Sequence, residues 1–598
     1  MKKSIESGVG QAARRGVRAR RVMSALLLSG GLIWASPSVL AEETLQVSLD
    51  APESVRGLLE EYLRILNRPD QAVPDDVGDR VALFRRARRE VASLLATEGY
   101  FAPEVSLDRA DRGDWTIVVD PGERARIADV DIGFEGHIAE DGEQREQRRQ
   151  ALIDDWLLPV DEPFRQSDWD SAKQSLLHGV RVRNYATARI RRSRAEVDPE
   201  AASVRLRVRV DSGQPYFLGP LEVSGIERLP SSLVERYSNL SEGDPYDQNR
   251  LLAFQRSLQN APQFAAVSVD INRDPLTAAA APVEVQVSEA ESRHLGFGAG
   301  YSTNTGARTE VNWRDVNFRG RAWELSTGLR LEQARQSIYS DIFLPPSRAG
   351  HRDSFGAVVE RSDIEGLQVN KQAIGGVRTR QRGDIETALA LRYQHETLRP
   401  SGSDRRSYNA LTAKWTWTQR KVDDLLDPRQ GYVLQGEFGG GAEALLSDQN
   451  FFRSYGRFAY YMPVRERDVF ITRAEVGKTF APSREGIPQD FLFRTGGSQS
   501  VRGYAYNSLG VEEGNAVLGG RYLATASAEY VNWFRPQWGA AAFVDAGDAA
   551  DDTDSFDPRV GYGVGARYRT PAGPIALDVA YGHQDRRFRL HFSIAVAF

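Results

Sequence analysis

From residue 292 to the C-terminus, the sequence consists of short segments in which apolar and polar residues alternate. Clusters of Gly, Pro, Asp and Asn separate these segments. Alternation with a period of two indicates β-strands that present one face to an apolar environment and the other to a polar one. Sixteen strands are predicted, near residues 293–303, 308–318, 322–332, 335–345, 351–362, 366–380, 384–398, 407–419, 431–441, 449–463, 467–478, 517–533, 537–548, 559–570, 573–582 and 587–598.

Aromatic residues favour a membrane barrel over a soluble β-sandwich, which shows similar alternation. Many lie towards the ends of the predicted strands, as in the aromatic girdles of transmembrane barrels: Trp313, Phe318, Trp323, Phe343, Trp415, Trp417, Tyr460, Tyr461, Trp533 and Phe534. Arg and Glu fill many alternate positions, which predicts a polar lumen. Because only a closed sheet leaves no unpaired backbone facing lipid, residues 292–598 are expected to form an all-β, 16-stranded antiparallel transmembrane barrel.

The first 41 residues have the features of a secretory signal peptide. Five arginines, Arg14 to Arg21, precede an apolar core at Val22 to Ala35, and small residues end at Ala41. The core is shorter than the roughly 20 residues that a membrane anchor needs. Cleavage after Ala41 is predicted.

Composition limits the compartment and the ligands. The chain has no cysteine, which excludes disulfides, cysteine-ligated zinc and cysteine nucleophiles, and which suits a compartment where thiols are oxidised. Its formal net charge of -5 lacks the basic surplus of nucleic-acid-binding proteins, so no nucleic acid partner is expected.

Residues 42–291 contain the same pattern three times, at 42–122, 123–212 and 213–291. Each unit is expected to have the order βααββ and an α+β fold. Two details recur at matching places. A helix that ends in Leu precedes an aromatic residue that opens a strand, and the last strand of the first two units closes on a similar tripeptide: Leu95 and Tyr100, Leu177 and Tyr185, Leu258 and Phe264, Asp120-Pro121-Gly122 and Asp211-Ser212-Gly213.

A glycine-rich stretch, Gly496 to Tyr504, separates two predicted barrel strands. Its glycines let the backbone fold back on itself, while Arg502 needs a polar partner once it leaves bulk water. The composition alone also fits an ordinary surface loop. Because this stretch lies between two predicted barrel strands, we expect it to form a loop that is inserted into the lumen.

Alternation indicates a carboxylate partner for Arg502. Val544 and Ala546 are expected to face lipid, so Asp545 faces the lumen. Glu529, on the preceding strand, is the second candidate by the same alternation. Because a guanidinium is suited to carboxylate pairing, we expect Arg502 to bridge to Asp545, with Glu529 nearby, and to pin the loop inside the barrel.

Four motifs carry a family resemblance: Val501-Arg502-Gly503-Tyr504 between strands eleven and twelve, Phe543-Val544-Asp545-Ala546-Gly547 in strand thirteen, Gly563 to Pro574 in the next strand and turn, and Asp423 to Tyr432 before strand nine. With them, the chain resembles the outer-membrane assembly and transport superfamily that includes BamA and TamA. The repeats resemble polypeptide-transport-associated (POTRA) domains, periplasmic modules that bind extended polypeptides. The last strand, which ends at Phe598, resembles the recognition signal of outer-membrane proteins.

Three repeats resemble the TamA family, whose members form the outer-membrane part of the translocation and assembly module. The resemblance implies a chain in the cell outer membrane, with its repeats in the periplasm, that assists insertion or secretion of β-barrel clients such as autotransporters. It also implies a lateral seam between the first and last strands. The implied partners are an inner-membrane-anchored TamB-like protein, unfolded outer-membrane protein clients and outer-membrane lipid, with no cofactor.

The first barrel strand has a feature that bears on this seam. Gly296, Gly298 and Gly300 occupy every second position, so one face of the strand lacks side chains and its cross-strand packing is weakened. The alternative interpretation is that these glycines only relieve crowding against an adjacent plug.

Enzymatic motifs are missing from the sequence, which has no Gly-x-Ser-x-Gly, no His-Glu-x-x-His and no phosphate-binding Gly-x-x-x-x-Gly-Lys-Ser/Thr. No catalytic activity and no metal site are expected. A two-partner secretion transporter, which exports a soluble client through the lumen, is the alternative function. Such transporters usually have two repeats and a pore helix, for which Glu42 to Leu49 is too short. A passive porin needs neither repeats nor a plug.

Overall fold

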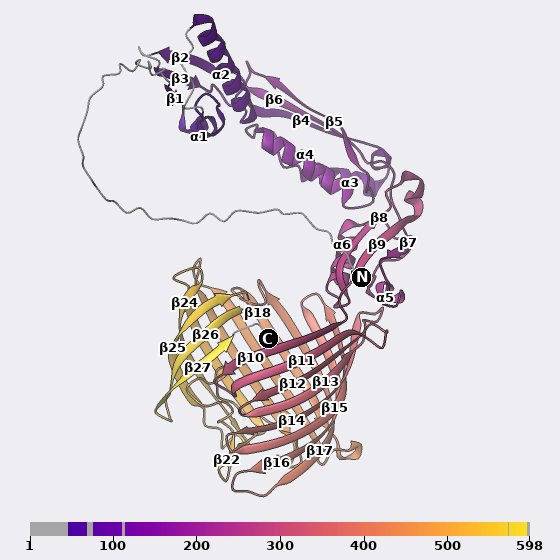
Figure 1. Ribbon diagram of the computed structural model, residues 1–598, viewed down its shortest axis with the longest axis vertical. Helices are drawn as coiled ribbons and strands as arrows, with labels where there is room; N and C mark the ends of the chain where they lie inside the picture. Colours follow the sequence, from indigo (N-terminus) through magenta and orange to yellow (C-terminus); the bar gives the residue numbers. More distant parts are fainter. Residues whose placement is uncertain (1–45, 68–75, 110–113, 572, 595–598) are drawn as a thin grey trace, which may run out of the picture. The chain divides into compact units, whose positions relative to one another are not determined.

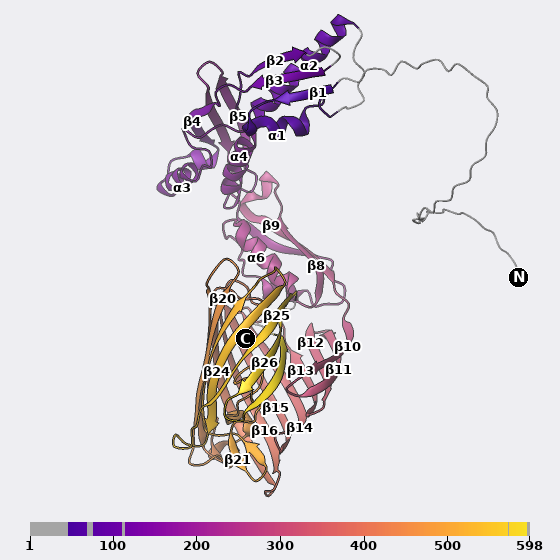
Figure 2. The same cartoon turned by 90° about the vertical axis from the view of Figure 1, so that its left-hand side faces the viewer.

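The computed structural model describes residues 46–67, 76–109, 114–571 and 573–594. The predicted signal peptide and Phe598 lie outside these residues. Three α/β units precede one large β-sheet, and Figure 1 and Figure 2 label their elements. Among the described residues, no helix is long and apolar enough to cross a membrane.

Each α/β unit has the predicted order βααββ. The first contains β1 (Gln46–Asp50), α1 (Glu53–Tyr62), α2 (Val77–Thr97), β2 (Glu104–Arg109) and β3 (Asp114–Asp120). The second contains β4 (Arg126–Glu135), η1 (His137–Ala139), α3 (Glu143–Asp154), α4 (Gln166–Arg181), β5 (Arg189–Asp198) and β6 (Ser203–Asp211). The third contains β7 (Leu218–Ser224), α5 (Ser232–Tyr237), α6 (Gln248–Gln259), β8 (Phe264–Ile271), η2 (Pro275–Ala280) and β9 (Ala281–Glu289).

In each unit the last strand lies in the centre of a three-stranded sheet, in the orders β1-β3-β2, β4-β6-β5 and β7-β9-β8. Local sequence explains the helices. The Asp247 side chain accepts hydrogen bonds from two backbone N–H groups at the start of α6. Leu251, Phe254 and Leu258 then recur at helical spacing and are buried in the core of the third unit. The predicted domain boundaries remain predictions.

The remaining sixteen strands form a single sheet in chain order, which confirms the predicted barrel strands. They are β10 (Arg293–Ser302), β11 (Gly306–Phe318), β12 (Trp323–Glu332), β13 (Arg335–Phe343), β14 (His351–Ile364), β15 (Leu367–Arg382), β16 (Ile385–Pro400), β17 (Arg406–Val422), β18 (Gly431–Gly441), β19 (Phe451–Pro463), β20 (Val469–Phe480), β23 (Tyr522–Asn532), β24 (Trp538–Ala550), β25 (Arg559–Thr570), β26 (Gly573–Gly582) and β27 (Arg587–Ile594). All neighbouring strands pair antiparallel.

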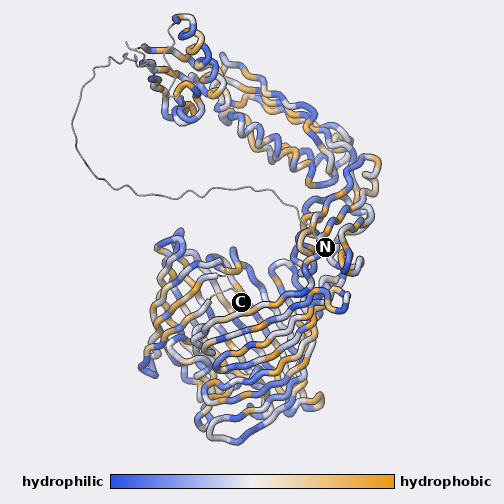
Figure 3. The backbone as a smooth tube through the Cα atoms, viewed as in Figure 1, coloured by the Kyte–Doolittle hydropathy of each residue, from blue (hydrophilic) through white to orange (hydrophobic). Residues whose placement is uncertain are grey.

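The side chains alternate between the two faces of this sheet, as predicted. On β24, Phe543 and Asp545 are buried while Val544 is exposed on the outer face. Figure 3 shows the same alternation as a change of hydropathy along the barrel strands. Some neighbouring strands are joined by tight turns: the two residues between β14 and β15, Glu365 and Gly366, both have positive φ.

The prediction of an outward-facing girdle is wrong for two aromatic residues. Tyr461 and Trp533 are buried and line a cavity inside the barrel. Each is adjacent in sequence to an exposed aromatic residue, Tyr460 or Phe534. Because successive side chains of a strand point to opposite faces, only one residue of such a pair can face lipid.

Candidate functional site

The candidate site is built on the chain that connects β20 to β23. This connection includes a short turn, η4 (Gln489–Phe491), and a hairpin of β21 (Val511–Glu513) and β22 (Ala516–Leu518). Its residues 496–504 are named the inserted loop. Arg502 is only 3% exposed, and Val501 and Tyr504 are buried as well. This burial does not fit an ordinary surface loop.

Arg502 meets Asp545 of β24 through three hydrogen bonds. The backbone N–H of Arg502 donates to Asp545 Oδ2 at 3.0 Å, Nε donates to the same oxygen at 2.7 Å, and Nη2 donates to Oδ1 at 2.9 Å. Two parallel contacts between a guanidinium and a carboxylate fix the orientation of both groups. Phe543, on the same face of β24, lies with its ring centroid 3.4 Å from Arg502 Cζ, and its ring face attracts the cation.

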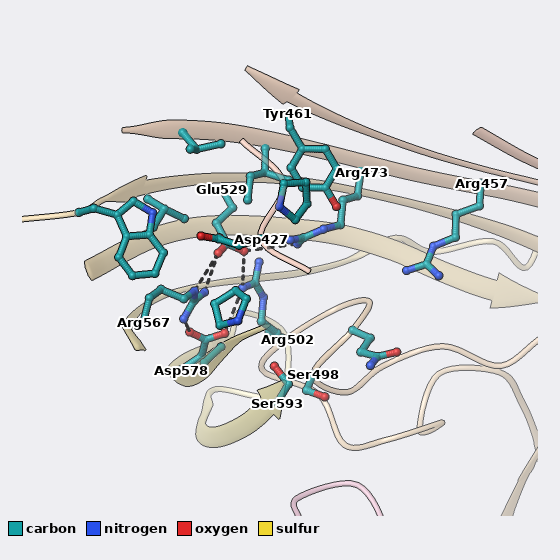
Figure 4. Close-up of a pocket in the computed structure, with 18 residues that line it drawn as sticks. Asp427, Arg457, Tyr461, Arg473, Ser498, Arg502, Glu529, Arg567, Asp578 and Ser593 are labelled. Atoms are coloured by element: carbon teal, nitrogen blue, oxygen red, sulfur yellow. Dashed lines mark hydrogen bonds and ion pairs between the residues drawn. The ribbon is translucent and has the colours of Figure 1, made fainter. Parts of the chain in front are cut away.

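Arg502 also belongs to a larger cluster of charges. Its Nη1 donates to Glu529 Oε2 at 2.9 Å and to Asp578 Oδ2 at 3.1 Å. Arg567 donates from Nη2 to Glu529 Oε1 at 2.6 Å and from Nη1 to Asp578. Arg473 Nη1 lies 3.3 Å from Glu529. Three guanidinium groups therefore face three carboxylates, and the six residues are named the Arg502 cluster: Arg473, Arg502, Glu529, Asp545, Arg567 and Asp578. Figure 4 labels all of them except Asp545.

The Arg502 cluster is largely buried, although the Arg473 side chain is 27% exposed. The side chains of Arg502, Glu529 and Asp578 are each 4% exposed, and that of Asp545 is fully buried. Buried charges lose their hydration, and only close opposite charges and hydrogen bonds offset that loss. If Arg502 leaves, Asp545 loses its guanidinium partner. The cluster therefore holds the loop in a single place.

Glycines let the loop approach the barrel wall closely. Gly503 has a φ of 95°, which favours glycine, and a Cβ there would lie 2.7 Å from the Gly582 nitrogen. A Cβ on Gly561 would lie 1.7 Å from the Arg502 carbonyl oxygen. Both contacts would be impossible with any side chain. The loop backbone thus packs directly against β25 and the end of β26.

Gly503 and Tyr504, which follow Arg502 in the Val501-Arg502-Gly503-Tyr504 motif, have their own hydrogen-bond partners. The Gly503 N–H donates to His591 Nε2 of β27 at 3.0 Å. The Tyr504 hydroxyl donates to the Val560 carbonyl oxygen at 3.1 Å and also contacts Gln584. Through these contacts the motif reaches β25, β27 and the turn before β27.

A second set of charges anchors the same connection on another part of the wall. Lys371 of β15 donates to the Asp490 carboxylate at 3.2 and 3.3 Å and lies 3.6 Å from Glu360 of β14. The backbone N–H of Gln489 donates to Glu396 of β16 at 2.8 Å. Asp490 and Gln489 belong to η4. The chain that connects β20 to β23 is therefore anchored to the barrel wall at two places, at η4 and at the Arg502 cluster.

The structure brings together three of the residues singled out in sequence, Arg502, Glu529 and Asp545. At Gly547, the atoms nearest to an added Cβ belong to the neighbouring strand β23, at the Ala524 carbonyl oxygen and Thr525, and not to the inserted loop. Sequence reasoning missed the other cluster members, the η4 contacts and the histidine of β27. Alternation could have identified Asp578 as lumen-facing, because its neighbours Leu577 and Val579 are apolar.

The two ends of the sheet are β10 and β27, the strands between which the seam is predicted. Strand β10 pairs only with β11 and β27 only with β26, so the described residues contain no strand pairing between β10 and β27. Within the described part of the chain, the Phe592 N–H of β27 donates a hydrogen bond at 3.3 Å to Oγ1 of Thr303, which directly follows β10. The inserted loop is nearby, since Asn304 Nδ2 donates to Ser498 Oγ at 3.3 Å.

The glycines of β10 face the lumen, because Leu295, Phe297 and Tyr301 are exposed on the other face. Among the described residues, a Cβ at Gly298 would have only Glu310 of β11 within 4 Å, and one at Gly300 only Arg308 of β11. The inserted loop therefore does not crowd these two positions.

A cavity of about 260 Å³ lies beside the Arg502 cluster, lined by Arg457, Tyr461, Trp533 and Ser593 among others (Figure 4). Four arginines and three carboxylates line it together, so the two signs of charge nearly balance. No group of three or more histidine, aspartate or glutamate residues within the described ranges is placed to hold a metal ion.

Comparison with known proteins gives the family. The Omp85 superfamily domain matches residues 293–598. The outer membrane protein assembly factor BamA of Nitratidesulfovibrio vulgaris is 22% identical over 84% of this chain and 65% of its own length. BamA of Neorickettsia risticii is 23% identical over 67% of this chain and 58% of its own length. The chain thus spans less than two thirds of the length of these relatives.

A solved structure has the same fold. Haemophilus ducreyi BamA lacking POTRA domains 1-3 aligns with a TM-score of 0.64 at 16% identity, over 78% of this chain and 98% of that chain. Together with the sixteen-stranded sheet, these matches show that the chain belongs to the Omp85 superfamily and is an outer-membrane β-barrel protein whose N-terminal α/β units, consistent with POTRA domains, lie in the periplasm.

Proposed function

We propose that this chain is the outer-membrane component of the translocation and assembly module and assists insertion or secretion of β-barrel clients such as autotransporters. Clients would enter at the seam between β10 and β27. The observation that supports this most is the pair of free sheet edges, because the described parts of β10 and β27 do not pair with each other. The three N-terminal α/β units match the repeat count expected of the TamA family.

A free edge can template a client strand. Its backbone N–H and C=O groups pair with any extended segment, whatever the side chains. On β10 all ten residues pair with β11, so the opposite edge of the strand remains for a client. Gly298 and Gly300 have few neighbours on the lumen side, which leaves room for the side chains of an incoming strand.

The inserted loop supports the seam from inside. It contacts Asn304, next to the end of β10, and His591 of β27. Its two anchors, at the Arg502 cluster and at η4, keep it in the lumen while the wall opens. A secretion transporter of the two-partner type requires the lumen to be cleared, and so both anchors to break. The anchored loop therefore favours assembly at the wall over export through the lumen.

The α/β units supply binding edges in the periplasm. In the described residues, each outer strand of the three-stranded sheets pairs with one strand only, although loop residues make backbone hydrogen bonds to the start of β4 and of β7. These edges are suited to hold unfolded outer-membrane protein clients, and one of them to receive an inner-membrane-anchored TamB-like partner. The proposed mechanism needs no cofactor and no catalytic group, since client folding provides the free energy.

Crosslinking in intact envelopes, followed by purification of this chain, tests the proposal. The expected result is capture of a large inner-membrane-anchored protein together with unfolded barrel clients. A matched variant that lacks residues 42–122 but keeps the barrel should lose part of this capture. Capture of one soluble secreted protein, without any inner-membrane protein, would favour the two-partner transporter instead.

A further inference from the structure

The outer face of the barrel carries a groove between β17 and β20, on other strands than those that form the seam. Its cavity has a volume of about 590 Å³. Exposed apolar side chains border it: Trp415, Leu434, Phe438, Val476 and Phe480. Because these side chains point away from the lumen, the groove opens towards the bilayer.

Glycines make the groove deeper than the spaces between ordinary outward side chains. Gly436 lies between the exposed residues Leu434 and Phe438, so its missing side chain would also point outward. A Cβ on Gly436 would lie 3.7 Å from the Phe438 ring, and one on Gly456 would lie 3.7 Å from Val476. Both are ordinary contact distances, so side chains could be accommodated there. Their absence leaves an open floor.

One wall of the groove is flat and aromatic. The rings of Trp415 and Phe438 stack at a centroid distance of 5.9 Å and an interplanar angle of 20°. Val476 of β20 borders the opposite side. A flat apolar wall beside a bare backbone floor suits a long, unbranched hydrocarbon chain, which fills space by dispersion contacts and needs no polar partner.

One cationic side chain, that of Lys478, lines the groove. Lys478 lies between Val476 and Phe480 on the outward face of β20, and its Nζ is 4.7 Å from the Phe480 ring centroid and 4.9 Å from that of Tyr522. Within the described residues, no carboxylate lies close enough to form an ion pair with it. An ammonium group without a carboxylate partner on the lipid-facing surface attracts negative headgroups, and the two aromatic rings do not neutralise its charge.

The position of Lys478 along the barrel identifies the leaflet. Strand β10 begins at the end of the barrel that follows the periplasmic units, and antiparallel order makes every second strand begin at that end. Strand β20 is the eleventh of the sheet, so it begins at the periplasmic end at Val469 and ends outside at Phe480. Lys478 therefore lies near the outer headgroup region.

We propose that this groove binds one anionic phosphorylated lipid of the outer leaflet. An acyl chain would lie over Gly436 and Gly456 beside the Trp415 wall, and the phosphate would contact Lys478. The apolar groove supplies affinity for the chain, and the lysine supplies preference for a negative headgroup. This inference does not depend on the proposed role in client assembly.

Native mass spectrometry of the purified full chain tests the proposal. The probes are dioleoyl-phosphatidylglycerol and dioleoyl-phosphatidylcholine, which share their acyl chains and differ in headgroup charge. Wild type is expected to retain the anionic lipid in preference to the zwitterionic one, by about fivefold, since one lysine at an anionic surface contributes about 1 kcal/mol.

Two variants separate the parts of the site. Lys478→Gln should remove the preference but keep binding of both lipids, whereas Gly456→Leu should weaken retention of both. Ala566→Leu, on the outer face of β25, adds the same side chain elsewhere and should behave as wild type. Folding of every variant is checked by heat-modifiable migration on gels. Equal retention of the two lipids by wild type, or unchanged retention by Gly456→Leu, would overturn the proposal.

Discussion

Arg502 and Asp545 are joined by three hydrogen bonds, of which one comes from the backbone N–H of Arg502 and two from its guanidinium. Every substitution of Arg502 except proline keeps the backbone N–H that donates this bond. The guanidinium bonds, in contrast, carry the charge pairing that makes burial of Asp545 tolerable. The loop position and the burial of a carboxylate are therefore coupled through one side chain.

Arg502→Ala should release the inserted loop while the barrel remains folded. Removal of one partner of a buried ion pair costs about 3–5 kcal/mol, because the other charge stays buried and unpaired. We expect faster protease cleavage between residues 481 and 521 in intact cells and impaired client assembly. Asp545→Ala should act in the same direction. Wild-type cleavage rates together with full client assembly in both variants would show that the interlock is unnecessary.

The Arg502 cluster should respond as a unit. Glu529 also contacts Arg473 and Arg567, so Glu529→Gln removes a charge that three arginines share. The effect of Arg502→Ala combined with Glu529→Gln on loop cleavage should be smaller than the sum of the single effects, with a coupling of about 0.5–3 kcal/mol. Strict additivity in this double-mutant cycle would mean that the two residues act independently.

The glycine contact with the barrel wall predicts a steric effect without any change of charge. Gly561→Ala places a Cβ at the Arg502 carbonyl oxygen, so the loop must shift at a cost of about 1–3 kcal/mol. Gly298→Ala is the matched control, because its Cβ would have only an ordinary contact with Glu310 at 3.8 Å. Loop cleavage should increase in the first variant alone. Equal cleavage in the two variants would exclude close packing as the cause.

Glu289, at the end of the third α/β unit, predicts that the stability of the fold around it depends on pH. Burial alone would raise the pKa of Glu289, but hydrogen bonds from the backbone N–H groups of Arg228, Glu227 and Leu229, and from the Arg228 guanidinium, lower it to about 2. A lowered pKa in the folded state means that the carboxylate stabilises the fold fully above about pH 4.5 and that this contribution is lost as the pH falls towards 2.

Hydrogen exchange of the 227–229 amides in the full chain measures this effect. At pH 6, Glu289→Gln should exchange these amides faster than wild type. The ratio of the two rates should approach one between pH 4.5 and pH 2, because wild type then also carries a neutral side chain; comparison at equal pH removes the intrinsic pH dependence of exchange. A ratio that stays constant over this range would contradict the assignment.

Local alternation was enough to predict the strands and the lumen-facing position of Asp545, because both depend on period-two geometry within a single segment. It could not identify Arg567 and Asp578 as partners of Arg502. Which of many lumen-facing charges meet depends on the path of the loop and the curvature of the sheet. The same limit explains why the contact of Lys371 with Asp490 was missed, since 119 residues separate the two in sequence.

Adjacent aromatics show a second limit. The position of these aromatic residues near strand ends predicted an outward-facing girdle. Only one residue of each adjacent aromatic pair, however, can face lipid. Tyr461 and Trp533 instead fill space beside the Arg502 cluster. Composition identifies the environment of a segment, whereas the face of each residue follows from its place in the alternation.

The most direct test of the account is a reversible disulfide across the seam. Thr303→Cys with Phe592→Cys joins β27 to the residue that follows β10, where the Phe592 N–H donates to Thr303, in a chain that has no other cysteine. Ala299→Cys with Thr309→Cys is the control, because these residues pair within the sheet on β10 and β11.

Client insertion into vesicles by the reconstituted, fully oxidised proteins is then compared with insertion after reduction. The account predicts that the seam disulfide blocks insertion, that reduction restores it, and that the control disulfide has no effect. Insertion at the reduced rate by a barrel whose seam is completely crosslinked would contradict lateral opening.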